Sequence, residues 1–139
     1  MSILQLDLPD ARVVDLFAGS GALGLEALSR GAAHVDFVEV APRSITTLRQ
    51  NVALLDAETD VTIERGDAIR FIERLPAHAY DVAFVDPPYR EGLAEQVAAV
   101  WTRTPFARVI GIEHEKSVTL AGGDARAYGD TVVTFFRSV

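Results

Sequence analysis

Residues 12–24 read RVVDLFAGSGALG, and this stretch decides the fold. Its opening part, RVVDLF, is mainly apolar, which is typical of a buried strand. Three glycines follow at positions 19, 21 and 24, in the spacing G-x-G-x-x-G, and they lead into a helical pattern that ends near Arg30. A strand that passes through a glycine turn into a helix is the opening unit of an α/β sheet, and such sheets bind ligands at the carboxyl ends of their strands.

The same alternation of apolar runs and helical patterns continues to the end of the chain. It predicts right-handed crossovers and a mainly parallel sheet of about seven strands with helices on both faces, as in Rossmann-like folds. The last two strands lack an intervening helix, so we expect an antiparallel hairpin at one edge. After the first unit, we expect strands at 34–40, 61–64, 80–85, 108–113 and 131–136, a weak strand at 118–120, and helices at 42–55, 68–75 and 92–101.

The composition is that of one ordinary globular domain. At 139 residues, with 49% hydrophobic and 24% charged residues, the chain is expected to fold as a single domain over residues 1–139. The absence of cysteine excludes disulfides, thiolate nucleophiles and cysteine-ligated metals. No apolar run reaches the roughly 20 residues of a membrane span, and the N-terminus lacks the basic and apolar regions of a secretory signal. We therefore expect a cytoplasmic protein without a membrane partner.

The net charge is unusual for a protein that binds nucleic acid. It is −7 at neutral pH, with a pI near 4.8, which is the reverse of the basic surface that nucleic-acid binding favours. Of the 13 basic residues, however, 12 are arginines and one is Lys116. Because arginine binds phosphates bidentately, a local basic patch on an acidic body is compatible with RNA binding.

Asp15 distinguishes between the two ligands that the glycine turn could bind. By glycine spacing alone the turn fits a dinucleotide, as in an NAD-dependent oxidoreductase, and it could also be a tight turn without a ligand. Asp15 lies four residues before Gly19, close to where a dinucleotide would place its pyrophosphate, and a carboxylate there would repel phosphate. S-adenosylmethionine carries a cationic sulfonium and an ammonium group, which a carboxylate attracts. The sequence therefore favours S-adenosylmethionine.

Two further acids follow the next two strands. Glu39 ends the second strand and is placed to accept hydrogen bonds from ribose hydroxyls, although it could also be an exposed loop acid. Asp67 follows the third strand and is placed to accept from the adenine amino group, or it caps the helix that begins at Ala68. Both roles of Asp67 are compatible. We assign to the cofactor site Asp15, Phe17, Gly19, Ser20, Gly21, Glu39, Val40, Asp67, Ala68 and Asp86.

The fourth strand ends in the tetrapeptide Asp86-Pro87-Pro88-Tyr89, which we assign as the catalytic turn. The prolines stop the strand and leave carbonyl oxygens without competing N–H groups. The Asp86 carboxylate and a carbonyl can accept the hydrogens of an aromatic amino group and turn its lone pair toward a methyl donor. Tyr89 would stack on an unpaired or flipped base. Orientation alone can lower the barrier by roughly 7–11 kcal/mol, so this chemistry requires no metal.

The histidines show no spacing typical of a metal site. Glu113, His114 and Glu115 resemble a ligand cluster, but in a strand the two glutamates would share one face and His114 would lie on the other. A shared ion is therefore not expected. Their position at the carboxyl end of the fifth strand is compatible with a minor role at the pocket rim. Tyr128 and the three residues after it predict a turn into the last strand.

Several of these stretches together resemble one family. The segment DLFAGSGALGLEALSRGAAHVDFVE (15–39), followed by DPPY (86–89), EHE (113–115) and YGDT (128–131), is similar to the small bacterial 16S ribosomal RNA guanine-N2 methyltransferases. The resemblance extends from Arg12 to Arg137. It implies a class I methyltransferase fold, S-adenosyl-L-methionine as the cofactor, methylation of guanine N2, and the assembled small ribosomal subunit as the RNA partner.

One feature departs from that family, and other functions use the same catalytic turn. Members of the family carry an arginine- and threonine-rich arm before the first strand, whereas here 11 residues precede Arg12 and none is basic. We expect that the chain has lost its RNA-binding element, or that it is a fragment or a divergent homologue that holds its substrate differently. DPPY also occurs in DNA adenine, DNA cytosine-N4 and protein-glutamine methyltransferases. A catalytically idle domain that serves a partner subunit is a further alternative.

Overall fold

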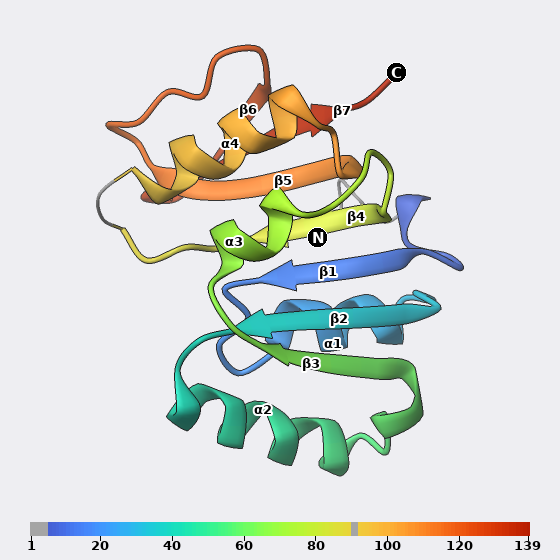
Figure 1. Cartoon of the computed structure of the whole chain (residues 1–139). Coiled ribbons are helices and arrows are strands. Elements are labelled where there is room, and N and C mark those ends of the chain that lie inside the picture. The colour runs from blue at the N-terminus through green and yellow to red at the C-terminus, as the bar shows by residue number, and fades with distance from the viewer. Residues whose placement is uncertain (1–5, 90–91) are drawn as a thin grey trace.

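The computed structural model describes residues 6–89 and 92–139, and in this part of the chain seven strands form one sheet in the order β3-β2-β1-β4-β5-β7-β6 (Figure 1). The first five strands of the chain are parallel, β7 is antiparallel to β5, and β6 is antiparallel to β7. The prediction of a mainly parallel sheet with an antiparallel edge hairpin is confirmed. The strands are β1 (Arg12–Leu16), β2 (His34–Glu39), β3 (Val61–Arg65), β4 (Tyr80–Val85), β5 (Ala107–Glu115), β6 (Asp124–Tyr128) and β7 (Thr131–Arg137).

Helices cover both faces of the sheet, as predicted. In Figure 1, α3 and α4 lie in front of the sheet and α1 lies behind it. The core is divided accordingly, because one cluster of buried side chains contains residues of α3 and α4 and the other contains residues of α1 and α2. Among the described residues, none of the helices is long and apolar enough to cross a membrane. The helices are α1 (Ala22–Ser29), α2 (Pro42–Leu54), α3 (Ala68–Glu73) and α4 (Leu93–Arg103), with a short 3-10 turn, Glu58–Asp60, before β3.

The central strands are apolar along their length because both of their faces are covered. In β1, Val14 packs in the core of α3 and α4, whereas Val13 packs in the core of α1 and α2. Gly24 lets α1 approach β2 closely, since a Cβ at this position would overlap the side chains of Phe37 and Val35. The third glycine of the turn therefore serves helix–sheet packing, and α1 begins in a fixed position above the end of β1.

The edge of the sheet differs from the sequence prediction in one respect. The prediction of a weak strand at 118–120 is wrong. Val118 donates its N–H to the Glu115 carbonyl in a turn, and Leu120 is buried in the core without pairing to a strand. Strand β6, which the sequence did not predict, occupies the edge instead. All five of its residues are exposed, so its sequence lacks the apolar alternation that marks a half-buried strand.

Candidate active site

The glycine turn between β1 and α1 is built from left-handed backbone and one buried carboxylate. Phe17, Gly19 and Gly21 have φ angles of 58°, 58° and 84°. Asp15, the second-last residue of β1, is only 2% exposed. Its Oδ2 accepts the backbone N–H of Gly24 at 3.0 Å. The Asp15 carboxyl therefore ties the first turn of α1 to the end of β1.

The same carboxyl has an unusual affinity for protons. Burial raises the pKa of Asp15 to about 7, against the opposing effect of the Gly24 N–H, and the negative charges of Asp86 and Glu39 raise it further. Three acids from adjacent strands therefore lie within electrostatic reach of one another. A cationic group placed among them would be attracted to all three carboxylates, whereas a phosphate would be repelled.

Glu39, at the end of β2, fixes the backbone of the turn beside it. Its Oε1 accepts the N–H of Gly19 at 2.7 Å, and its Oε2 accepts the N–H groups of Val40 and Ala41 at 2.9 and 2.8 Å. An ionised carboxylate offers about four acceptor positions, so one position on Oε1 stays open to a ligand hydroxyl. The backbone role is an addition to the expected one, and ribose binding stays a prediction.

Asp67 follows β3 and caps α3. Its Oδ2 accepts the N–H of Arg70 at 2.9 Å, which confirms the capping role that the sequence allowed. Beside it is a hollow of about 510 Å³ at the ends of β2 and β3. Three exposed arginines, Arg65, Arg70 and Arg74, line this hollow. Three acids, Glu64, Asp67 and Glu73, line the same hollow, so its formal charges balance. The position fits an adenine ring near Asp67.

The other residues assigned to the cofactor site surround this arrangement. Phe17 is half-buried and packs against the core of α3 and α4. Ser20 is exposed, and its carbonyl accepts the side-chain amide N–H of Asn51 at 2.9 Å. Val40 is 62% exposed, whereas Ala68 is buried as the first residue of α3. All of them follow the carboxyl ends of β1, β2 or β3, where the sequence placed them.

The predicted catalytic turn follows β4, the strand next to β1. Asp86 is exposed, Pro87 is buried, and Pro88 and Tyr89 are exposed. The turn leaves the sheet without helical structure, and the two prolines offer carbonyl oxygens only. Because β1 and β4 pair through Leu16 and Val85, Asp86 comes directly beside the start of the glycine turn.

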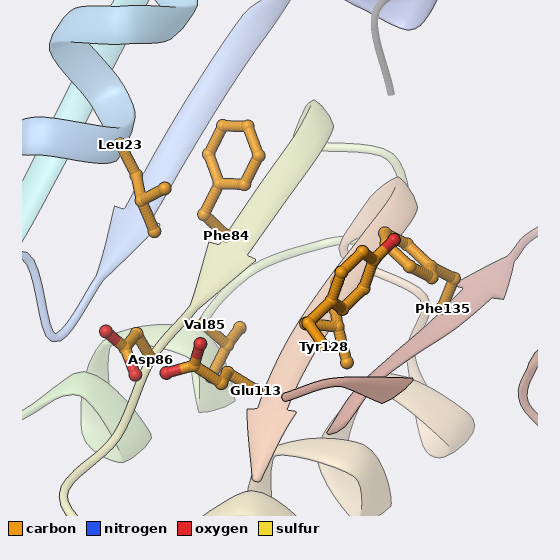
Figure 2. Close-up of a pocket in the computed structure, with 9 residues that line it drawn as sticks. Leu23, Phe84, Val85, Asp86, Glu113, Tyr128 and Phe135 are labelled. Atoms are coloured by element: carbon orange, nitrogen blue, oxygen red, sulfur yellow. The ribbon is translucent and has the colours of Figure 1, made fainter. Parts of the chain in front are cut away.

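A cavity of about 200 Å³ opens next to Asp86, between α1 and the strands β4 to β7 (Figure 2). Its walls are largely apolar and include Leu23, Phe84 and Phe135, and its second acidic side chain is Glu113 of β5. Figure 2 shows the Glu113 carboxyl pointing toward Asp86. A hydrogen bond shared with Asp86, partial burial and the Asp86 charge raise the pKa of Glu113 to about 7. The sequence placed Glu113 only near the rim of the site.

The remaining residues of the EHE segment have structural contacts. His114 is 3% exposed, and its Nε2 lies 2.7 Å from the Thr134 hydroxyl while its Nδ1 lies 3.0 Å from the Glu115 carbonyl. These contacts use both ring nitrogens. Over residues 6–89 and 92–139, no group of three or more histidines and acids is arranged to hold a metal ion.

Comparison with known proteins supplies a family for this architecture. The family model described as Conserved hypothetical protein 95 matches residues 1–137. The chain is 32% identical over 114 residues to the ribosomal RNA small subunit methyltransferase D of Buchnera aphidicola, covering 80% of this chain and 59% of the relative. It is 41% identical over 87 residues to the protein of the same name from Escherichia coli, covering 63% of this chain and 43% of the relative. The chain thus spans about half the length of these curated relatives.

Solved structures show the same fold. A conserved hypothetical protein from Streptococcus pyogenes superposes with a TM-score of 0.83 at 28% identity, covering 99% of this chain and 94% of that one. An RNA methyltransferase from Salinibacter ruber, solved in complex with S-adenosyl-L-homocysteine, superposes with a TM-score of 0.76 at 13% identity, covering 98% of this chain and 87% of that one. The second likeness concerns the fold alone.

Proposed function

Because this chain belongs to the family described as Conserved hypothetical protein 95, we propose that it is an S-adenosylmethionine-dependent RNA methyltransferase. The proposed reaction transfers a methyl group to the exocyclic N2 amino group of a guanine in small-subunit ribosomal RNA, with the assembled subunit as the substrate. Relatives named for small-subunit ribosomal RNA methylation support the substrate class.

One observation carries this proposal: the Asp86 turn lies directly beside the end of β1, where Asp15 lies and the glycine turn begins. The pairing of β1 with β4 brings the two turns together, and the Asp86 charge contributes to the raised pKa of Asp15. A methyl donor held by the glycine turn would therefore present its sulfonium close to Asp86. The two reactants would meet where the carboxyl ends of β1 and β4 meet.

The residues at the carboxyl ends of β1, β2 and β3 fit S-adenosylmethionine, which supplies an electrophilic methyl group on a cationic sulfur. Asp15 would attract the ammonium and sulfonium charges, and the open acceptor position of Glu39 would receive a ribose hydroxyl. Asp67 and the backbone N–H of Ala68 would contact adenine in the adjacent hollow. A Cβ at Gly19 would meet no atom within 4 Å, so the turn leaves open space above it.

Asp86 and its neighbours would act by orienting the amino group of the base. The Asp86 carboxylate and the Pro87 carbonyl would each accept one N–H hydrogen, which directs the nitrogen lone pair toward the methyl group. The N–C bond would form as the methyl–sulfur bond of the donor breaks, with its electron pair going to sulfur. Asp86 would receive the proton that leaves the nitrogen. Tyr89, which is 51% exposed, is available to stack on the base.

RNA binding on an acidic chain requires arginines that can reach the phosphate backbone. Arg65, Arg70 and Arg74 are candidates, because they are exposed around one hollow at the carboxyl ends of the strands, which Glu64, Asp67 and Glu73 also line. Arginine binds phosphate oxygens bidentately, and three such side chains would position the RNA backbone without reading its sequence.

The test is methyl incorporation from labelled S-adenosylmethionine into unmethylated small ribosomal subunits, with naked RNA and DNA alongside. We expect incorporation into the particles, and mass spectrometry of the digested RNA should identify N2-methylguanosine. Asp86→Ala should lower the rate by on the order of 100-fold or more, as expected when a transition-state hydrogen-bond partner is removed, while calorimetry shows nearly unchanged cofactor affinity. Asp60→Ala, in the exposed turn before β3, is the control for loss of one carboxylate.

Each alternative outcome has a distinct meaning. Methyl incorporation into DNA, or into a protein of the particle, would mean that the Asp86 turn methylates DNA or protein rather than an RNA base. Cofactor binding without transfer to any substrate would favour a domain that needs a partner chain. Loss of cofactor affinity in Asp86→Ala would contradict the orienting role of Asp86.

A further inference from the structure

We propose that Glu113 reads the base: together with Asp86 it presents two adjacent carboxylates to the N1–H and N2–H groups of guanine, which makes Glu113 the specificity-determining residue of the site. This inference rests on the proposed function and extends it to a residue of β5. Asp86 would accept from the amino group that receives the methyl, and Glu113 would accept from the neighbouring N1–H.

The register of the sheet places the two carboxyls side by side. Strands β4 and β5 are parallel, with Val85 opposite Ile112, so the next residues of the two strands are Asp86 and Glu113. Both line the cavity of about 200 Å³ at the strand ends, and Figure 2 shows the Glu113 carboxyl pointing toward Asp86.

Apolar side chains line the cavity beside these two carboxyls. The apolar side chains of Leu23, Phe84 and Phe135 form walls of the same cavity, which limits the water that competes with a ligand. The cavity is smaller than the roughly 300–1,000 Å³ of sites for drug-sized ligands. Its size and chemistry suit one edge of a base rather than a whole nucleotide.

Two adjacent acceptors select among the bases that carry an amino group. The Watson–Crick edge of guanine presents two neighbouring donors, N1–H and the N2 amino group. Adenine places the N1 lone pair beside its amino group, and cytosine places the N3 lone pair there. Either lone pair would face the Glu113 carboxylate without a hydrogen between them, which is unfavourable once the bound base has displaced water from these acceptors. Guanine is thus the base that satisfies both carboxylates.

The charge state of the pair adds a pH dependence. Without substrate, the hydrogen bond with Asp86, burial and the Asp86 charge raise the pKa of Glu113 to about 7, so near neutral pH the pair retains a proton. The titratable side chains that line a hollow together with Glu113 are Asp86 and Tyr89 of the turn after β4, Glu95 of α4, Tyr128 at the end of β6, and His114 and Glu115 of its own strand. Guanine requires both carboxylates ionised, so kcat/KM should rise with pH through about 7.

The experiment compares guanine with 2-aminopurine at the methylated position. 2-Aminopurine keeps the 2-amino group but has a lone pair at N1 in place of the hydrogen. The reaction of wild-type protein with unmethylated particles first identifies the methylated position. Particles are then rebuilt with a ligated RNA that carries 2-aminopurine at that position. We measure kcat/KM on both particles for wild type and for Glu113→Gln, whose amide can donate to an N1 lone pair. Glu58→Gln, before β3, is the matched control.

We expect wild type to prefer guanine over 2-aminopurine by about 10- to 100-fold, as for a hydrogen bond to a charged group. Glu113→Gln should lose a similar factor on guanine, narrow the preference to within about threefold, and lose the pH dependence through 7. 2-Aminopurine also lacks the oxygen at position 6 of guanine, but this loss affects wild type and the variant alike. The change in the guanine-to-2-aminopurine ratio between the two proteins therefore reports on N1. Unchanged cofactor affinity by calorimetry shows that the variant is folded. If it is not folded, Glu113→Asp replaces it: its shorter side chain should lower kcat/KM on guanine while the pH dependence through 7 is kept, and an unchanged kcat/KM would overturn the inference.

An unchanged guanine rate and an unchanged preference in Glu113→Gln would overturn this inference and leave the proposed function intact. If wild-type protein instead produces a modified adenine or cytosine, or methylates no RNA, the proposed function fails, and the role of Glu113 in reading guanine fails with it.

Discussion

Replacement of Asp15 by asparagine should stabilise the cofactor-free protein at alkaline pH while weakening its cofactor affinity. Asp15 is 2% exposed, and burial is the main cause that raises its pKa from 3.8 to about 7. In the unfolded chain the carboxyl ionises near 3.8, so between these two values the folded state binds one proton more than the unfolded state. Stability therefore falls as pH rises through this window and is level above about 7.

The magnitude follows from the width of that window. About three pH units at roughly 1.36 kcal/mol each give a total loss of about 4 kcal/mol, of which about 3 kcal/mol falls between pH 5 and pH 8. Asparagine carries no charge, and its side-chain oxygen can still accept the N–H of Gly24. The stability of Asp15→Asn relative to wild type should therefore be about 3 kcal/mol higher at pH 8 than at pH 5.

The assay is urea unfolding of both proteins at pH 5 and pH 8, with Asp60→Asn, in the exposed turn before β3, as the control for loss of a carboxylate. Calorimetry with S-adenosylmethionine at pH 8 should show weaker binding to Asp15→Asn, because the ligand's positive charges lose an anionic partner. The reasoning is refuted if the stability difference between Asp15→Asn and wild type is the same at both pH values.

Two further perturbations test the neighbouring parts of the site. Glu39→Gln places an amide NH₂ group against backbone N–H groups whose hydrogen bonds Glu39 now accepts. Urea unfolding should therefore show a loss of about 1–3 kcal/mol in the free energy of unfolding, and calorimetry should show reduced cofactor affinity. A variant as stable as wild type would contradict the three hydrogen bonds. Arg70→Ala with Arg74→Ala should weaken binding to small ribosomal subunits and lower the slope of log affinity against log salt by about 1–2, measured in a KCl series, whereas an unchanged slope would exclude these arginines from phosphate contact.

The parallel part of the fold was predictable because its strands are buried on both faces. Valine-rich runs such as β1 can be recognised as buried strands from the sequence without knowing which strands they pair with. Strand β6 was not predictable, since all five of its residues are exposed and it exists through pairing with β7. The β-branched and apolar residues 118–120 misled for the opposite reason: Leu120 lies in a loop and is buried in the core, and such a short run alone does not distinguish a strand from buried coil.

The site was predictable in position but less so in its contacts. Motif spacing placed Asp15, Glu39 and Asp67 at successive strand ends, and the structure has them there. The hydrogen bonds that Glu39 makes with the glycine turn depend on backbone geometry that spacing does not contain. Glu113 was underestimated because its neighbour Asp86 lies 27 residues earlier in the sequence, and only the pairing of β4 with β5 brings them together. The register of two predicted parallel strands was the signal that could have revealed this pair.

The three hydrogen bonds of Glu39 also determine how the protein meets its ligand. One carboxylate joins the glycine turn after β1 to the segment that leads from β2 into α2, across 20 residues of sequence. The turn is thus held in its left-handed conformation by the protein's own contacts. The proposed cofactor would meet a preorganised surface there, so little of the interaction free energy would be spent on ordering a loop, and more of it would appear as affinity.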